Sequence, residues 1–475
     1  MKKLSAFLFV LFCLISCSKE NTNQSISQQL TIFFVNDQHG QIENFSKIKH
    51  IVDLERQETE VIVACSGDIF SGNPVVDNWE DKGFPIIDIM NRVGFDISVL
   101  GNHEFDYGEE ILKKRMEQAE FEWVCANIDM GNTGLPEPPN FKSITTENLK
   151  VAFLGLIETN GKPNATIPST HPWKVENFIF QRPENVVAQY SNIKEAQDAD
   201  LYIALSHLGH TAFGGAMGDF QLAQQFPYFD LIIGGHTNQL LDTMVNNIPI
   251  FQAGVNLNHM GKIKLSIKDK SIESINYELI DLNTYSAFDA DLKAIIDNYN
   301  ADMSHLDEII GFADVYHAPI NVGCFYTDAL REALNVDICI QNTGGIRSDL
   351  GEGPISKREI YEISPFNNGT LIYNMTVGEI KTFLKGSGSW FFYSGIQIEQ
   401  VDSEINLLNE NGQLLSDDMN LTLGINDYVP AVFDTYFPPN PSVQANTDAE
   451  MIIQYLENSS ENVSYPDCTR YFRFQ

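Results

Sequence analysis

The stretch LTIFFVNDQHG, residues 30–40, decides the fold that the sequence predicts for the first half of the chain. Residues 30–35 form an apolar run with Thr31 as its one polar residue, which is typical of a strand buried on both faces in a parallel sheet. The run leads into Asp37 and His39, two side chains that can hold a divalent metal ion. Because open α/β sheets place their sites beyond the carboxyl ends of the strands, the stretch predicts a metal site at such an edge.

Four further apolar runs end in the same way. The runs 61–64, 97–100, 201–205 and 231–233 lead into Asp68, into Asn102 and His103, into His207, and into His236 and Asn238. A helix cap or a turn explains any one of these residues as well as a metal does, but it does not explain the ordered set. Carboxylate, imidazole and amide groups without thiolate are typical of a hard or borderline metal. The sequence therefore predicts that the ligands converge.

Different tasks are predicted within this set. Asp37 and His39 are alternate residues, which share one face of an extended segment, so both can reach one ion. Asp68 lies in GDIFSG (67–72) between two glycines, and its two oxygens suit it to bridge two ions. Two ions about 3.5–4 Å apart deprotonate a bridging water that attacks phosphorus in line. A dinuclear phosphoesterase site is the resulting hypothesis.

The segment GNHEFD (101–106) holds the predicted catalytic residues. Asn102 is a ligand candidate through its amide oxygen, and the adjacent His103 is expected to point elsewhere. Asp106 is close enough in sequence to fix the tautomer of His103, so the two residues form a predicted catalytic dyad. His103 would stabilise a non-bridging or leaving oxygen. A structural turn pair is the alternative.

The rest of the chain indicates two unequal domains, because 475 residues exceed one ordinary core. From 30 to 282, apolar runs alternate with amphipathic segments such as 48–58 and 192–198, as in α/β domains. We expect one domain at 30–285, a connector helix at 286–308 and a second domain at 309–475. Further expected elements are an antiparallel edge at 242–265, helices at 324–334 and 377–384, a strand at 337–341 and turns at 342–353.

The net charge of −34 makes basic-patch binding of a nucleic-acid polymer or an anionic lipid surface improbable. A small phosphate ester still fits such a chain, because bound metal ions reverse the local field. The sequence therefore favours a small-molecule substrate. It leaves the oligomeric state open.

The first residues predict export. Lys2 and Lys3 precede an apolar stretch too short to span a membrane, and Cys17 follows it. Residues 1–17 resemble a bacterial lipoprotein signal peptide, which implies a lipid anchor at Cys17 on the periplasmic or surface face of the outer membrane. A plain secretory signal is the alternative. Residues 18–29 are expected to form a tether.

Apart from Cys13 and Cys17, five cysteines remain, at positions 65, 125, 324, 339 and 468. They are scattered and odd in number, so no disulfide framework is indicated. An exported protein can still form one bridge, and the sequence does not say which. Cys65 and Cys339 lie in apolar runs and are predicted to be core residues.

The motifs NDQHG (36–40), GDIFSG, GNHEFD, SHLGH (206–210) and GGHTN (234–238) together resemble the calcineurin-like metallophosphoesterases. With the second half, the chain is similar to the 5′-nucleotidase/UDP-sugar hydrolase family. The resemblance implies a four-layered α/β/β/α sandwich and a smaller α+β substrate-binding domain. It also implies one ion at Asp37, His39, Asp68 and Asn238, a second at Asp68, Asn102, His207 and His236, and a dyad of His103 and Asp106.

The same resemblance assigns substrate contacts in the second domain. The element N-x-G-G-I-R implies that Asn342 and Arg347 contact the phosphate and sugar. The segments SPF (364–366) and NDY (426–428) imply that Phe366 and Tyr428 sandwich a base, although both aromatics alone suggest core residues. Asp434 keeps the family's spacing from Tyr428.

Two departures from the family concern the substrate pocket. Residues 430–435, PAVFDT, replace a glycine-rich turn, so this loop must be reshaped. The stretch YHAPINVG (316–323) lacks an arginine that the family carries. The sequence therefore predicts a complete metal centre beside an altered pocket.

The combined expectation is a hydrolase that releases phosphate from extracellular nucleotides and uses two divalent ions, which can be Zn, Mn, Co or Mg. The same chemistry on 2′,3′-cyclic nucleotides, UDP-sugars or non-nucleotide phosphomonoesters is the first alternative. A non-catalytic surface binding protein and a structural lipoprotein are the others.

Overall fold

The computed structural model describes residues 27–162, 167–212 and 215–475. The predicted signal peptide, Cys17 and the tether as far as residue 26 lie outside the described residues. Strand β1 (Gln28–Val35) includes the last two tether residues, because Gln28 and Gln29 pair with Ile267 and Ser266. In the described part of the chain, no helix has the length and apolarity that a membrane crossing needs.

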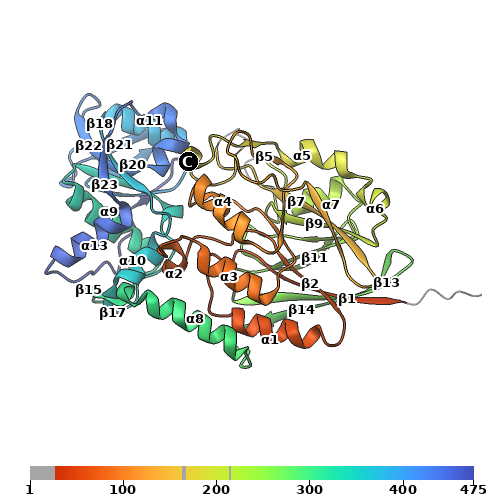
Figure 1. The fold of residues 1–475 in the computed structure, drawn as a ribbon. Coiled ribbons are helices and arrows are strands. Elements are labelled where there is room, and N and C mark those ends of the chain that lie inside the picture. Colours follow the sequence, from red (N-terminus) through yellow and green to blue (C-terminus); the bar gives the residue numbers. More distant parts are fainter. Residues whose placement is uncertain (1–26, 163–166, 213–214) are drawn as a thin grey trace, which may run out of the picture.

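Two six-stranded sheets build the N-terminal half (Figure 1). The first sheet has the order β14 (Ser271–Asp281), β13 (His259–Lys268), β1, β2 (Glu60–Cys65), β3 (Ile97–Val99) and β4 (Glu122–Val124). The second has the order β11 (Leu240–Val245), β12 (Ile248–Ala253), β10 (Leu231–Ile233), β9 (Leu201–His207), β7 (Lys150–Ile157) and β6 (Phe141–Thr145). The five predicted strands are confirmed, and they are divided between the sheets.

The core explains why β1 carries apolar residues on both of its faces. Leu30, Ile32 and Phe34 are buried between the two sheets, whereas Phe33 and Val35 are buried under helices. The helices on the first sheet are α1 (Phe45–Glu55), α3 (Phe84–Val93), α4 (Glu109–Gln118) and α8 (Ala290–Asp302). Those on the second are α5 (Pro183–Val186), α6 (Ile193–Ala196) and α7 (Asp219–Gln225). The expected α/β/β/α layering is confirmed.

The other sequence-based expectations for this half are met in part. The helix expected at 48–58 begins earlier, at Phe45, and the segment 192–198 forms only the short α6. In the expected antiparallel region, β11 pairs antiparallel with β12, but β12 itself is parallel to β10. Helix α8 occupies the predicted connector and packs on α1 and α3 before the chain enters the second half (Figure 1).

The C-terminal half is a third six-stranded sheet with helices on both faces. Its order is β23 (Ser442–Thr447), β18 (Gly369–Thr376), β22 (Asn420–Asn426), β16 (Ile338–Asn342), β19 (Phe391–Ser394) and β24 (Tyr471–Phe472). One face carries α9 (Pro319–Leu334), α10 (Lys357–Ile363) and α13 (Asp448–Asn458). The other carries α11 (Val377–Ser387), α12 (Tyr428–Val432) and the hairpin of β20 (Gln397–Val401) and β21 (Glu404–Leu408). The helices expected near 324–334 and 377–384 are α9 and α11.

Short elements complete the fold. The remaining strands and helix are β5 (Ile128–Asp129), β8 (Ile179–Phe180), β15 (Ile309–Ala313), β17 (Gly353–Ser356) and α2 (Pro74–Asp77). The remaining elements, all 3₁₀ helices, are η1 (His103–Phe105), η2 (Pro172–Lys174), η3 (Val187–Tyr190), η4 (Ser304–Asp307), η5 (Thr343–Gly345) and η6 (Asp434–Tyr436). Of these, η1, η2 and η5 contribute residues to the neighbourhood of the candidate site.

One disulfide joins Cys324 in α9 to Cys468 near the end of the chain, across a sequence separation of 144. Cys65, Cys125 and Cys339 are free and buried. The expectation that Cys65 and Cys339 are core residues is therefore confirmed. The bridge closes a long loop around the third sheet, which restricts the unfolded chain.

Replacing both bridged cysteines, as Cys324→Ser with Cys468→Ser, should destabilise the C-terminal half by about 2–4 kcal/mol, because the unfolded loop regains its conformational entropy. Calorimetric melting should show a lower unfolding midpoint than in the oxidised wild type. Reduced wild type is the control and should melt like the double variant. Identical melting of oxidised and reduced wild type would contradict the predicted role of the bridge.

Candidate metal centre and active site

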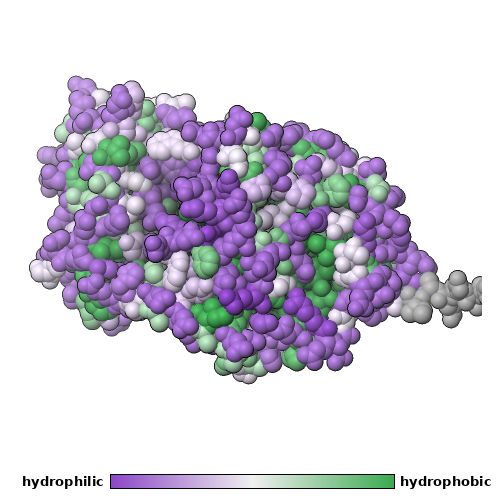
Figure 2. Space-filling model, viewed as in Figure 1, coloured by the Kyte–Doolittle hydropathy of each residue, from purple (hydrophilic) through white to green (hydrophobic). Residues whose placement is uncertain are grey.

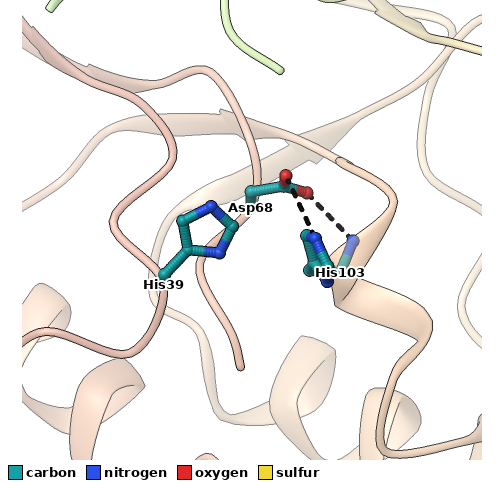
Figure 3. Close-up of side chains that lie close together, drawn as sticks. All are labelled: His39, Asp68 and His103. Carbon is teal, nitrogen blue, oxygen red and sulfur yellow. Dashed lines mark hydrogen bonds and ion pairs between the residues drawn. The ribbon is translucent and has the colours of Figure 1, made fainter. Parts of the chain in front are cut away.

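The loops after five strands bring the predicted ligands into two overlapping groups. His39, Asp68 and His103 form one group, and Asp68, His207 and His236 form the other. Within each group the possible ligand atoms lie within 4.8 Å of one another. Figure 3 shows Asp68 between the rings of His39 and His103. Asp68 belongs to both groups, which is the arrangement expected of a bridging ligand.

Asn102 and His207 present their ligand atoms to the second group. Asn102 Oδ1 lies 3.2 Å from His207 Nε2 and 2.9 Å from His236 Nδ1. The other ring nitrogen of His207, Nδ1, lies 2.6 Å from the carbonyl oxygen of Ser66, which turns Nε2 toward Asp68. Ligand atoms that each bind one ion at about 2.0–2.2 Å come about as close to one another as these atoms do. These atoms therefore already surround a common point.

Asp37 and Asn238 belong to neither of the two ligand groups but lie beside them. The Asp37 carboxylate accepts a hydrogen bond from His236 N at 2.9 Å and lies 4.0 Å from His207 Nε2. Asn238 is exposed and lines the adjoining cavity. Asp37 is thus closest to the second group, whereas His103 stands with His39 in the first. The structure brings all seven predicted ligands to one edge, with this difference in grouping.

The ligand loops have an unusual backbone conformation. Asp37, His39, Asp68, His236 and Asn238 have φ angles of 50°, 48°, 56°, 75° and 58°. Residues other than glycine rarely adopt this left-handed region, and each such residue costs about 1–3 kcal/mol. The sequence argument that Asp37 and His39 share a face of an extended segment is therefore wrong, because the segment turns at both residues. Strain of this kind concentrates at functional sites.

The buried carboxylate of Glu104 holds two of these loops together. It accepts hydrogen bonds from the backbone N–H of Asp68 at 3.1 Å and of Ile69 at 2.6 Å, and a third from Gly101. Burial, and next the charge of Asp68, raises the pKa of Glu104 to about 7, while these donors favour the charged form. Sequence reasoning missed Glu104. The available signal was an acid between a predicted catalytic histidine and the apolar Phe105.

Glycine allows the ligand loops to approach one another. A Cβ atom at Gly67 would lie 2.7 Å from His207 Nδ1 and 2.8 Å from the backbone nitrogen of Gly101. Gly67 also has a φ of 84°, which other residues adopt only with strain. The loops that carry Asp68, Asn102 and His207 can therefore meet at this point only because residue 67 is glycine.

The protonation states fit two divalent cations. Burial lowers the pKa of His39 to about 3 and also lowers the pKa of His236, so both imidazoles are neutral. Burial alone would raise the pKa of Asp68, but His207 and His103 hold it well below its ordinary value. His39 Nδ1 is buried and has no hydrogen-bond partner among the described residues. Neutral imidazole and ionised carboxylate are the metal-binding forms.

His103 and Asp106 form the predicted pair. His103 Nδ1 lies 2.6 Å from Asp106 Oδ2, and Thr170 Oγ1 donates to Asp106 Oδ1 at 3.0 Å. Burial opposes the charge on His103, yet Asp106 and Asp68 raise its pKa above the ordinary value. For Asp106, burial is likewise outweighed, and His103 lowers the pKa. Both shifts favour the charged forms of the pair, and His103 Nε2 faces Asp68 at 3.9 Å.

A cavity of about 230 Å³ lies between the two halves, beside the ligand groups. From the C-terminal half it is lined by Asn342, Gly344, Arg347, Phe366, Asn368 and Tyr428. Four of the five predicted substrate residues are therefore at the cavity. Asp434 is the exception: it is 65% exposed, pairs with Lys162 at 3.0 Å, and is not a lining residue. The reshaped loop explains this, because 428–432 forms α12 and carries Asp434 away.

The aromatic side chains make contacts that the sequence did not predict. The Phe366 ring is nearly parallel to the His103 ring, with 5.6 Å between centroids, and the Arg347 guanidinium lies 5.7 Å from the Phe366 centroid. Tyr428 lies edge-on to His171 at 6.0 Å. His171 belongs to the segment 169–174, which lines the cavity from the N-terminal half. The sequence alone did not identify this segment, because its one distinctive feature is the motif HPWK (171–174).

Comparisons with known proteins agree with this architecture. The calcineurin-like phosphoesterase model matches residues 30–240, and the model of the 5′-nucleotidase C-terminal domain matches residues 304–437. The trifunctional nucleotide phosphoesterase YfkN of Bacillus subtilis is 27% identical over 75% of this chain, which spans only 27% of that protein. The 5′-nucleotidase of Vibrio vulnificus is 23% identical, with 95% of each chain covered.

Among solved structures, a 5′-nucleotidase precursor from Thermus thermophilus has the same fold, with a TM-score of 0.80 at 19% identity. The match covers 93% of this chain and 98% of that one. Fold and matched residues together define a metallophosphoesterase domain followed by a 5′-nucleotidase C-terminal domain. The chain belongs to the 5′-nucleotidase family of calcineurin-like metallophosphoesterases.

Glu104→Gln should weaken metal binding by about tenfold or more, because an amide places N–H groups against the backbone donors that now fix the Asp68 loop. Metal content after dialysis against graded free Mn²⁺ measures the effect. Glu110→Gln is the matched control, since Glu110 is 82% exposed and pairs with the partly exposed Lys114 away from the site. Equal metal affinity in wild type and Glu104→Gln would contradict this role.

Proposed function

We propose that this protein is an exported, metal-dependent phosphohydrolase that releases phosphate from nucleotides. The observation that carries the proposal is the pair of ligand groups that share Asp68 and border a cavity lined by the His103 and Asp106 pair. Relatives named as a nucleotide phosphoesterase and a 5′-nucleotidase support the substrate class.

The proposed ligands divide into two sets. One ion is assigned to Asp37, His39, Asp68 and Asn238, and the other to Asp68, Asn102, His207 and His236. Oxygen and imidazole donors suit Zn, Mn, Co or Mg. When bound, such ions supply a Lewis acid and lower the pKa of a water molecule. Asp68 is assigned to both sets because its Oδ2 lies 3.0 Å from His207 Nε2 and 3.9 Å from His103 Nε2.

His103 is proposed to act on the phosphoryl oxygens. Asp106 occupies Nδ1 and raises the pKa of the ring, which favours the form in which Nε2 donates a hydrogen bond toward the metal groups. A fixed donor of this kind stabilises charge that develops in the transition state. The parallel Phe366 ring covers His103 and limits the access of water.

Nucleotide recognition is assigned to the C-terminal side of the cavity. Arg347 and Asn342 are proposed to contact the phosphate and sugar, and Phe366 and Tyr428 to stack on the base. Stacking on an aromatic contributes about 1–3 kcal/mol per base and tolerates different bases. All four side chains line the cavity, which makes simultaneous contact possible.

A second candidate keeps the chemistry and changes the substrate to a cyclic nucleotide, a UDP-sugar or a non-nucleotide phosphomonoester. It is favoured by the place of Asp434 outside the cavity and by the absence of residues 316–323 from its lining. Fewer specific contacts from the C-terminal half imply looser discrimination between leaving groups.

Export and anchoring through a lipid at Cys17 are part of the proposal, as is the division into domains at 30–285 and 309–475 with a connector at 286–308. The disulfide between Cys324 and Cys468 supports export, because such bridges persist in oxidising compartments. Labelling of whole cells with a radioactive fatty acid tests the anchor, since Cys17→Ser would abolish the label.

Purified protein loaded with Mn²⁺, Zn²⁺, Co²⁺ or Mg²⁺ should hydrolyse AMP with a higher kcat/KM than nitrophenyl phosphate, which lacks the sugar and base that the assigned contacts bind. AMP should also be preferred to 2′,3′-cyclic AMP and UDP-glucose, which have no terminal phosphomonoester. A chelator should abolish turnover. Faster hydrolysis of nitrophenyl phosphate than of AMP would support the second candidate. No turnover of any ester would support the alternative that the chain is a non-catalytic binding protein.

His103→Ala should lower kcat by about 10²-fold or more, as for the loss of one transition-state donor. Metal content, measured by mass spectrometry, should stay near that of the wild type. This control is needed because His103 also stands beside Asp68 and His39. Loss of an ion from the variant would show that His103 is a ligand instead.

A further inference from the structure

The segment 169–174 connects the catalytic pair to the C-terminal half. Thr170 donates to the Asp106 carboxylate, and Lys174 Nζ donates to the backbone oxygen of Asp106 at 2.6 Å. The same ammonium lies 3.5 Å from the backbone oxygen of Phe366. Lys174 therefore lies between the pair of His103 and Asp106 and the Phe366 ring, which is proposed to stack on the base.

The ammonium group of Lys174 has more N–H donors than these two contacts use. A lysine ammonium has three N–H donors and rotates freely about its last bond. Two of them are directed at the carbonyl oxygens of Asp106 and Phe366. Since Lys174 also lines the cavity, the third is available to a ligand there.

Each half of the molecule contributes one lysine or arginine side chain to the cavity. Among the described residues that line it, these are Lys174 from the N-terminal half and Arg347 from the C-terminal half. Residues 316–323 contribute none. An anion between Lys174 and Arg347 would interact with both halves at once.

The charge of the whole molecule makes these two cations important. The chain has a net charge of −34, and hydrophilic residues cover most of the face shown in Figure 2. An anionic substrate approaches such a surface against a repulsive field, and local cations in a partly desolvated cleft oppose that field. Their effect should be largest on binding of the most highly charged substrate.

We propose that Lys174 is a specificity-determining residue that binds an anionic oxygen of the substrate opposite Arg347 and selects phosphomonoester dianions. The inference rests on the proposed function and names a residue that the family resemblance did not supply. The competing explanation is that Lys174 only ties the Phe366 loop to Asp106.

The test compares Lys174→Met, which keeps the length of the stem, with Lys174→Arg, which keeps the charge. For AMP, Lys174→Met should raise KM by about tenfold or more and change kcat by less than about threefold, the signature of lost ground-state binding. KM for the monoanionic diester bis(nitrophenyl) phosphate should change much less. Lys174→Arg should restore most of the AMP affinity.

Lys162→Met is the matched control. Lys162 also lies where the halves meet, and it pairs with Asp434 outside the cavity. If lysines act here by holding the halves together, Lys162→Met should raise KM as much as Lys174→Met does. The proposal expects a change below about twofold.

Calorimetric binding of inorganic phosphate to the metal-loaded protein tests the inference without turnover. Lys174→Met should bind phosphate at least about fivefold more weakly than wild type, because a charge-assisted hydrogen bond is lost. Equal phosphate affinity, or a fall in kcat with KM unchanged, would overturn the role of Lys174. Inactivity of the wild type on every ester would instead overturn the proposed function, and phosphate binding would still decide the role of Lys174.

Discussion

The candidate site depends on the buried carboxylate of Asp68, which lies between two groups of imidazoles. A buried charge of this kind is costly unless partners compensate it. His207, His103 and the backbone N–H of His103 do so in this structure, and bound cations would compensate the charge further. The glycine at residue 67 and the acid at residue 104 help to keep this carboxylate in position.

The sandwich provides the rigidity that this arrangement needs. Parallel strands of two stacked sheets end at one edge, so ligands that are distant in sequence meet there on short loops. Five ligand residues hold left-handed backbone angles, and the hydrophobic layers beneath them offset that strain. The C-terminal half then closes the site from one side, with Phe366 over His103 and Arg347 beside it.

Much of this was predictable because the signals are local. An apolar run followed by a metal-binding side chain indicates both the strand and the place of the ligand. The division of the strands between two sheets was not predictable from the runs, since residues 30–35 of β1 and the whole of β9 are equally buried. Only the family resemblance implied it.

Other features depend on contacts between distant segments. Glu104 is recognised only when its carboxylate is seen beside the amides of another loop, and Lys174 only when η2 is seen against residue 366. The bridge between Cys324 and Cys468 requires the C-terminal segment to return to α9. Asp434 was misplaced because spacing from Tyr428 was counted along a turn that is in fact the helix α12.

Anomalous diffraction from crystals grown with Mn²⁺ tests the central claim most directly. Two anomalous peaks about 3.5–4 Å apart, each within bonding distance of one Asp68 oxygen, are predicted. A single peak, or a pair that does not include Asp68, would contradict the account.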